Sequence, residues 1–233
     1  MNILAVDSSA VSAGCAVLRD DKLISSGFVN VGLTHSQTLM PLISDTLRGA
    51  GMALSDIDYI AVSVGPGSFT GVRIGVATVK GIAFAQNIPC VAVSTLEAIA
   101  AQAVGHRGYV CAVMDARRSQ VYNAIFSLDS GISRVTEDRA ISIAELQEEL
   151  SALCGDIWIC GDGAELCYRT FGEADNIYLA PESFRWQSGY GVALAARDKI
   201  LRGEVVDAAS LMPTYLRLPQ AERELNNLKK QQG

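Results

Sequence analysis

The chain has 233 residues, of which 49% are hydrophobic and 19% are charged. This composition is typical of a soluble globular protein, and the length suits one large domain or two lobes. No apolar run approaches membrane-spanning length and no leader pattern opens the chain, so we expect a cytoplasmic protein without membrane contact. The net charge of -6 and the pI near 5.0 argue against a strong grip on nucleic acid, because Lys and Arg neutralise phosphates.

Cysteine usage points away from a metal or disulfide framework. The six cysteines lie mostly beside apolar residues, no C-x-x-C pair occurs, and only two histidines are present to join them. We therefore predict buried thiols at Cys15, Cys90, Cys111, Cys154, Cys160 and Cys167.

Three β-like runs open the chain, at residues 2–6, 14–18 and 23–29. A helix then follows Thr34, which we expect to form a capping box with Gln37. Pro41 predicts a kink or a later helix start, and Gly51 marks the end.

The apolar run 58–64 predicts a central parallel strand, and the glycine motif 65–75 follows it and opens a helix over 70–86. Glycines before a helix N-terminus can bind an anion. The spacing G-x-G-x-x-x-G is, however, one residue longer than the dinucleotide fingerprint, no Lys follows, and Pro66 lacks an N–H group. These features favour a structural turn.

A short strand ending at Val93 and a helix over 94–102 follow, with Ser94 as cap and Glu97 completing a capping box. The stretch 105–108 reads as a boundary, after which the pattern of three strands and alternating helices and strands recurs. The expected elements are strands at 109–114, 120–128, 133–136, 156–160 and 177–179, and helices from 142, from 164 and over 189–202. The prediction is an α/β protein with lobes at 1–104 and 105–218 and a polar tail at 219–233.

The motif GPGSFTGVRIG at 65–75 and the opening MNILAVDSS closely resemble the bacterial TsaB family, also called YeaZ. The resemblance continues through THS at 34–36, VSTLE at 93–97, MDARR at 114–118 and YLR at 215–217. It implies a two-lobed actin-like ATPase (ASKHA) fold, with a β-β-β-α-β-α type unit in each lobe and a degenerate second lobe. It also implies a subunit of the machinery that attaches threonylcarbamoyl to the adenosine beside the tRNA anticodon.

In actin-like ATPases the turn after the first strand faces the metal and phosphates. The corresponding candidates for a nucleotide or anion cleft are Asp7, Ser8, Ser9, Gly65, Gly67, Ser68 and Thr70. Against this, Asp and Ser are common in turns for local hydrogen-bonding reasons. His35 we interpret as structural. Asp115 with Arg117 and Arg118 fits a cleft contact and a solvated turn equally.

The catalytic relative TsaD carries H-x-x-x-H where this chain has Thr95 and Ile99. Histidines four apart on a helix can share a metal, whereas isoleucine has no donor atom. We therefore expect no metal, no cofactor and no catalytic residue in this chain, with ATP used by the complex.

The resemblance implies a TsaD-like catalytic partner, a TsaE-like ATPase as further partner, tRNA contact only through the complex, and a homodimer when the chain is alone. The expected partner surface lies on the helices at 36–49 and 70–86, with the candidates Leu39, Ile43, Gly71, Val72, Gly75, Val76 and Val79. The alternative is that this small-residue ridge packs inside its own lobe. Two rival functions are an actin-like small-molecule kinase that uses Asp7, and a metallopeptidase.

Overall fold

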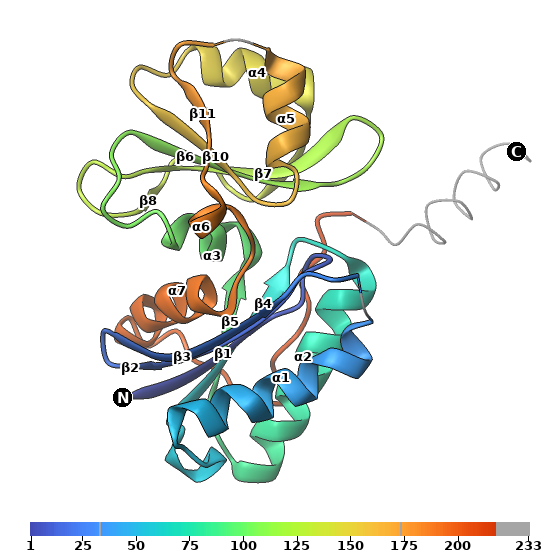
Figure 1. Ribbon diagram of the computed structural model, residues 1–233, viewed down its shortest axis with the longest axis vertical. Coiled ribbons are helices and arrows are strands. Elements are labelled where there is room, and N and C mark those ends of the chain that lie inside the picture. The colour runs from blue at the N-terminus through green and yellow to red at the C-terminus, as the bar shows by residue number, and fades with distance from the viewer. Residues whose placement is uncertain (33, 173, 218–233) are drawn as a thin grey trace, which may run out of the picture.

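The computed structural model describes residues 1–32, 34–172 and 174–217, and the polar tail predicted at 219–233 lies outside this range. Two sheets with helices on both faces form the molecule (Figure 1). The first contains β1 (Asn2–Asp7), β2 (Ala13–Arg19), β3 (Lys22–Val29), β4 (Tyr59–Gly65) and β5 (Cys90–Ser94). The second contains β6 (Tyr109–Asp115), β7 (Gln120–Ser127), β8 (Ser133–Arg134), β9 (Arg139–Ser142), β10 (Ile157–Cys160) and β11 (Ile177–Leu179).

The helices are α1 (His35–Ala50), α2 (Phe69–Gln86), α3 (Thr95–Ala101), α4 (Ile143–Ser151), α5 (Ala164–Phe171), α6 (Glu182–Arg185) and α7 (Gly189–Leu201), with a 3-10 turn η1 (Leu54–Asp56). Every predicted helix and strand is present, which confirms the α/β class. The strand β9 was not anticipated; it pairs with β7 beside the short β8. Within the described ranges, no helix is long and apolar enough to cross a membrane.

The two sheets repeat one topology. The first has the order β3-β2-β1-β4-β5 and the second the order β8-β7-β6-β10-β11. In each, the first strand pairs antiparallel with the second; β1 also pairs parallel with the fourth strand, β4, and β6 pairs parallel with β10, the fifth strand because β9 precedes it. The repeat inferred from the sequence is therefore confirmed, and it makes Asp7 at the end of β1 and Asp115 at the end of β6 equivalent in topology.

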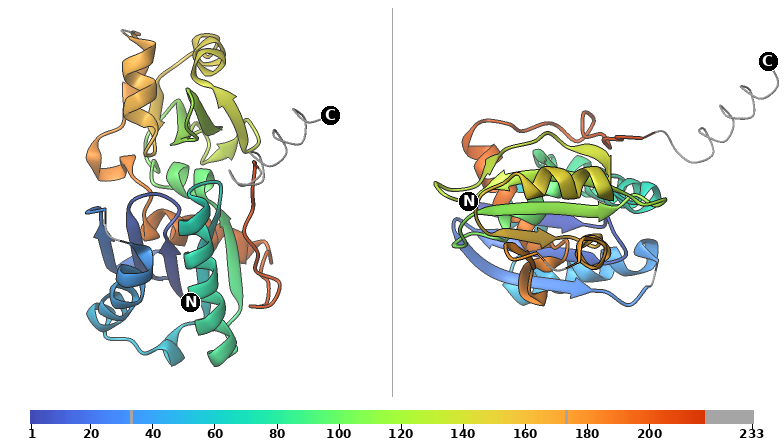
Figure 2. Two further views of the ribbon diagram at one scale, coloured as in Figure 1. Left: turned by 90° about the vertical axis from the view of Figure 1, so that its right-hand side faces the viewer. Right: turned by 90° about the horizontal axis from the view of Figure 1, so that it is seen from above.

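Alternation along the strands divides the core into layers. Leu4 and Val6 face α1 and α2, whereas Ile3 and Ala5 face α7. Helix α3 joins the two halves, because Ala98 packs with the first sheet and α7 while Leu96 packs with the second sheet. The left view of Figure 2 shows α3, drawn in green, between the two sheets.

Helix α7 differs from the expectation that it would complete the second set of elements. It packs against β1 and β2 of the first sheet instead. The approach needs two glycines, because a Cβ on Gly14 would lie 2.5 Å from the nitrogen of Gly189, and one on Gly189 would lie 2.5 Å from the carbonyl carbon of Cys15. Local sequence patterns could not predict this contact, because Gly14 and Gly189 are far apart in the sequence. The lobe boundary at residues 105–108 remains a prediction.

Two predicted capping boxes are wrong. Thr34 occupies the N-cap of α1 without a side-chain cap bond, and α1 begins at His35 and continues through Pro41 to Ala50. Ser94 does cap α3 by accepting from the Glu97 N–H, but the structure has no return bond from the Ser94 backbone N–H to the Glu97 carboxylate, so the box is incomplete. The Ser94 hydroxyl donates instead to Asp138 at 2.5 Å.

Five of the six predicted buried thiols are confirmed, and Cys154 is exposed. Burial raises the pKa of Cys15, Cys160 and Cys167 to about 12 each. These thiols remain protonated near neutral pH and behave as small apolar side chains.

Candidate functional site

Asp7, the last residue of β1, is hydrogen-bonded by residues of the first lobe. Asp7 is buried, and its carboxylate accepts hydrogen bonds from the Ser9 N–H at 3.0 Å, the Ser9 hydroxyl at 2.9 Å and the Ser63 hydroxyl. Burial raises the pKa of Asp7, and these hydrogen bonds oppose the shift. The carboxylate is therefore engaged by its own lobe.

The glycine motif closes over the same turn. The Ser68 N–H donates to the Ser9 carbonyl at 2.7 Å, and the Ser68 hydroxyl caps α2 by accepting from the Gly71 N–H at 3.2 Å. Any Cβ on Gly67 would collide with the Ser9 carbonyl. The Ser68 N–H, one of the groups that could have bound an anion, is thus already bonded to the Ser9 carbonyl. The motif therefore packs against the Ser9 backbone.

The start of α2 packs directly on Ser8. The Ser8 hydroxyl donates to the Gly71 carbonyl at 2.9 Å, and a Cβ on Gly71 or Gly75 would collide with the carbonyl or hydroxyl of Ser8. The small-residue ridge therefore faces its own lobe at these positions.

This packing corrects the predicted partner residues. Leu39, Ile43, Val72, Val76 and Val79 are each at most 3% exposed and belong to the core between α1, α2 and the sheet. The prediction that they face outward is wrong, because α2 turns its valine face inward. Its exposed face carries Arg73, Ala77, Gly81 and Phe84, spaced at helical intervals.

The predicted cleft residues Asp7, Ser8, Ser9, Gly65, Gly67, Ser68 and Thr70 come together at this one turn, with Thr70 exposed. His35 braces it, since its Nε2 lies 2.7 Å from the Ala10 carbonyl. Asp7 has no free oxygen aimed at an open cleft, so the arrangement gives no support to the kinase alternative.

The two positions at which TsaD carries histidines, Thr95 and Ile99 in this chain, lie in the core. Thr95 and Ile99 are fully buried, and Ile99 packs with Leu96, Ala100 and Met114. Among the residues that the structure describes, no group of three or more His, Cys, Asp or Glu side chains could hold a metal ion.

The second lobe has its own half-buried acid after β10, Asp162. Burial raises the pKa of Asp162 to about 6, and the Gln187 amide donates to its carboxylate at 2.9 Å. Gly161, directly before Asp162, adopts φ 109°, and Gly65, the last residue of β4, adopts φ 118°. The turns that follow β4 and β10 are topologically equivalent. From the sequence, residues 161–163 were predicted only as the start of a helix.

The segment 206–217, here called the C-terminal strap, joins three of the sequence motifs. It begins at Val206, which pairs with Cys90, and continues to Thr214, whose N–H donates to the Val64 carbonyl at 2.7 Å. Tyr215 then accepts from Arg73, and Arg217 donates to the Ala116 carbonyl at 3.0 Å. Sequence reasoning noted the YLR motif without assigning this role.

The hairpin that joins β6 to β7 is strained. Arg117, Arg118 and Ser119 have φ values of 65°, 57° and 54°, and such left-handed torsions cost about 1–2 kcal/mol per non-glycine residue. The hairpin is held by the Ala116 N–H to Gln120 carbonyl bond at 3.0 Å and by Arg217.

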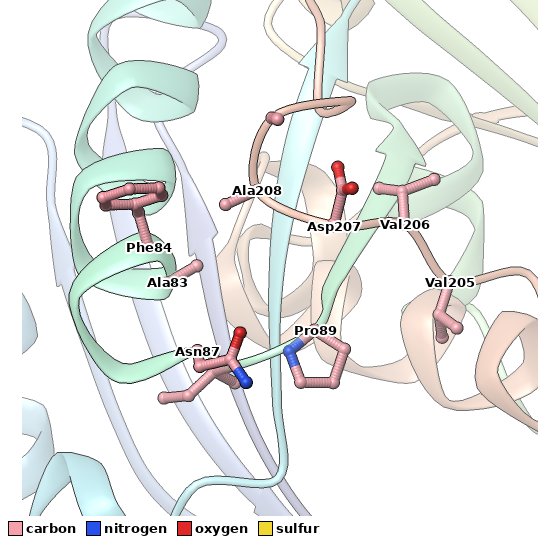
Figure 3. Close-up of a pocket in the computed structure, with 10 residues that line it drawn as sticks. Ala83, Phe84, Asn87, Pro89, Val205, Val206, Asp207 and Ala208 are labelled. Carbon is pink, nitrogen blue, oxygen red and sulfur yellow. The ribbon is translucent and has the colours of Figure 1, made fainter.

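A cavity of about 510 Å³ lies at the other end of α2, where Phe84 and Asn87 face Asp207 and Ala208 of the strap (Figure 3). Phe84 on its rim is 82% exposed. None of the predicted site residues lines this cavity.

The duplicated sheets and the β1 turn closed by a glycine-rich loop define an actin-like (ASKHA) two-lobed protein. The component A of (R)-2-hydroxyglutaryl-CoA dehydratase from Acidaminococcus fermentans shares this fold, with a TM-score of 0.53 at 15% identity over 86% of this chain and 99% of that chain. YeaZ from Pseudomonas aeruginosa is more similar, with a TM-score of 0.76 at 28% identity over 92% of this chain and 99% of that chain.

Sequence comparison agrees. Residues 30–224 match a family model described as TsaD, tRNA N6-adenosine threonylcarbamoyltransferase. The tRNA threonylcarbamoyladenosine biosynthesis protein TsaB of Bacillus subtilis is 32% identical, covering 95% of this chain and 96% of its own length. TsaB of Escherichia coli is 31% identical, and the match covers 97% of this chain and 98% of that protein. The chain belongs to the TsaB family.

Proposed function

We propose that this chain is a non-catalytic subunit in the synthesis of N6-threonylcarbamoyladenosine in tRNA, where it binds and supports a TsaD-type transferase. Membership of the TsaB family supports the pathway, because the relatives named above are tRNA threonylcarbamoyladenosine biosynthesis proteins.

The observation that supports a non-catalytic role for this chain, with catalysis by the TsaD-type subunit, is the identity and burial of Thr95 and Ile99. Isoleucine offers no donor atom to a metal, and its side chain is fully buried among apolar residues. A bound ion that activates the acyl group for attack by a weakly nucleophilic adenine nitrogen would have to come from another subunit.

The exposed face of α2 is the proposed partner surface. Ala77 and Gly81 are exposed, a Cβ on Gly81 would meet nothing within 4 Å, and Phe84 projects into solvent. Small residues let two helices approach closely, and an exposed aromatic ring supplies apolar area for a partner. Met40 on the neighbouring α1 is 50% exposed.

The same face would form the homodimer of the isolated chain, so partner and self-association would compete for it. A TsaE-type ATPase joins the proposed complex as the component that uses ATP, and the partner supplies most of the tRNA contact because the chain carries a net charge of -6.

Reconstitution tests this function. Purified TsaD-type and TsaE-type subunits, ATP, a threonylcarbamoyl donor and unmodified tRNA are combined with and without the chain, and the digested tRNA is analysed by mass spectrometry. We expect modified nucleoside only when both the chain and the TsaD-type subunit are present. Full modification without the chain would refute the requirement for it, and modification by the chain without the TsaD-type subunit would refute its non-catalytic role.

A further inference from the structure

Most described arginines lie within 4 Å of a carboxylate, but five of them (Arg19, Arg73, Arg107, Arg118 and Arg217) do not. Salt bridges within 4 Å hold Arg48, Arg134, Arg139, Arg169, Arg185, Arg197 and Arg202. Arg73, Arg118 and Arg217 make no such bridge within the described ranges, and Arg117 reaches Asp115 only at 3.6 Å with its own side chain 87% exposed.

These four arginines form one connected region. Arg73 donates to the Tyr215 hydroxyl at 2.7 Å, and two residues further along the strap Arg217 donates to the Ala116 carbonyl at 3.0 Å. Ala116 immediately precedes Arg117 and Arg118. The region therefore extends from the start of α2 in the first lobe to the β6–β7 hairpin in the second.

Aromatic rings are interleaved with the charges. The Arg73 guanidinium lies 3.8 Å from the centre of the Phe69 ring, which itself lies 5.1 Å from the Tyr215 ring. Arg217 lies over Tyr122 at 5.5 Å. We call Phe69, Arg73, Arg117, Arg118, Tyr215 and Arg217 the arginine–aromatic patch.

The hairpin is strained at two exposed members of the patch. Arg117 and Arg118 both have left-handed torsions, and bonds from neighbouring residues hold them there. A strained and fixed backbone at charged, solvent-facing residues indicates a role in recognition, because a relaxed turn would serve folding equally well. The side chains project outward without contributing to the core.

We propose that the arginine–aromatic patch is this chain's contact with the phosphodiester backbone of tRNA. Guanidinium groups bind phosphate in a fork geometry, and arginines interleaved with aromatic rings are typical of single-stranded or looped RNA surfaces. The inference rests on the proposed function and refines it, since the partner supplies most of the grip and the patch adds a local contact in an otherwise acidic chain.

The patch shares Arg73 with the exposed face of α2, but its hairpin members Arg117 and Arg118 lie on a different element. The β6–β7 hairpin belongs to the second lobe, whereas α1 and α2 cover the far face of the first sheet (Figure 1). Arg117 and Arg118 are thus the members whose replacement leaves the exposed face of α2 unchanged.

The test compares two double variants with equal loss of charge. One is Arg117→Gln with Arg118→Gln; its control is Arg48→Gln with Arg169→Gln, whose arginine side chains are 77% and 80% exposed on other elements. Each is assembled with the TsaD-type subunit, and its affinity for an unmodified tRNA transcript is measured by fluorescence anisotropy between 50 and 200 mM salt. Thermal melting confirms that both variants fold.

We expect the hairpin variant to bind tRNA about tenfold more weakly and the salt slope of log K to fall by about one to two, because one or two phosphate contacts are lost. The control should stay within about twofold of the unsubstituted complex. Arg117→Lys with Arg118→Lys should restore most of the salt slope, since lysine retains the charge.

Unchanged tRNA affinity and salt slope in the hairpin variant would overturn the proposal. Loss of binding to the TsaD-type subunit with tRNA affinity intact would overturn it too, and would assign the arginines to carboxylates of that partner. The proposed function is judged separately by reconstitution with the unsubstituted chain. If that reaction requires the chain while the hairpin variant binds tRNA normally, only the patch assignment fails.

Discussion

Arg73 and Tyr215, 142 residues apart in sequence, are joined by a hydrogen bond of 2.7 Å from the arginine Nε to the tyrosine hydroxyl. The bond fastens the C-terminal strap to the first turns of α2, beside the contact between the Tyr215 and Phe69 rings. The strap thereby connects the glycine motif with the hairpin of the second lobe.

This junction predicts a graded loss of stability. Tyr215→Phe removes the hydrogen bond and keeps the ring, and should lower the free energy of unfolding by about 0.5–1 kcal/mol. Tyr215→Ala should cost about 1 kcal/mol more, because the aromatic contact is lost as well. Urea unfolding followed by circular dichroism measures both. Equal effects of the two substitutions would show that the ring contact contributes nothing.

Neighbouring residues on α2 should separate folding from partner binding. Val76 is 3% exposed, so Val76→Arg places a charge in the core and should unfold the protein or destabilise it by more than about 4 kcal/mol. Ala77 is exposed, and Ala77→Arg should leave thermal melting within about 2 °C of the unsubstituted chain. The same substitution should abolish capture of the TsaD-type subunit in a pull-down. A folded Ala77→Arg variant that still binds would place the partner surface elsewhere.

The glycines of α2 should respond in opposite directions. Gly75→Ala forces a Cβ into the Ser8 hydroxyl and should destabilise by about 1–3 kcal/mol, because packed residues must move. Gly81→Ala enters open space and should stabilise by about 0.5–1 kcal/mol through helix propensity. Chemical denaturation of the pair provides the check. Stabilisation by both substitutions would mean that α2 does not pack on Ser8.

Local patterns predicted the elements well because their determinants lie within a few residues. The apolar run of β4 and the Ser94 cap of α3 needed only local spacing. The recurrence of three strands followed by helices and strands came from element order, and the pairing of the two lobes came from the family resemblance. The inward direction of Val72 and Val76 followed from neither, since α2 is apolar on more than one side and contacts with distant residues such as Ser8 determine which side faces the sheet.

Long-range contacts account for the remaining differences. The placement of α7 depends on Gly14 meeting Gly189, and the strap depends on Tyr215 and Arg217 meeting residues about 100 or more positions away. No periodicity encodes such pairs. The site residues were found as motifs, but their partners were not: Asp7 is satisfied by Ser63, 56 residues later.

Asp162 predicts a pH-dependent stability that can be isolated by substitution. Its pKa is raised from 3.8 to about 6, chiefly by burial. Because the folded state holds the proton more tightly than the unfolded state, this residue stabilises the fold most below about pH 4, and the contribution is lost as pH rises to about 6. The full change is on the order of 3 kcal/mol at most.

Asp162→Asn removes the titration while its amide oxygen can still accept from Gln187. The free energy of unfolding of the variant, relative to the unsubstituted chain, should therefore rise between pH 4 and pH 6 and stay level above pH 6. Asp175→Asn, at an exposed position, serves as the control for the loss of one surface carboxylate. Urea unfolding at pH 4, 5, 6 and 7 measures the difference. A difference that is constant across this range would mean that the Asp162 carboxyl titrates at its ordinary pKa and is solvated in the folded protein.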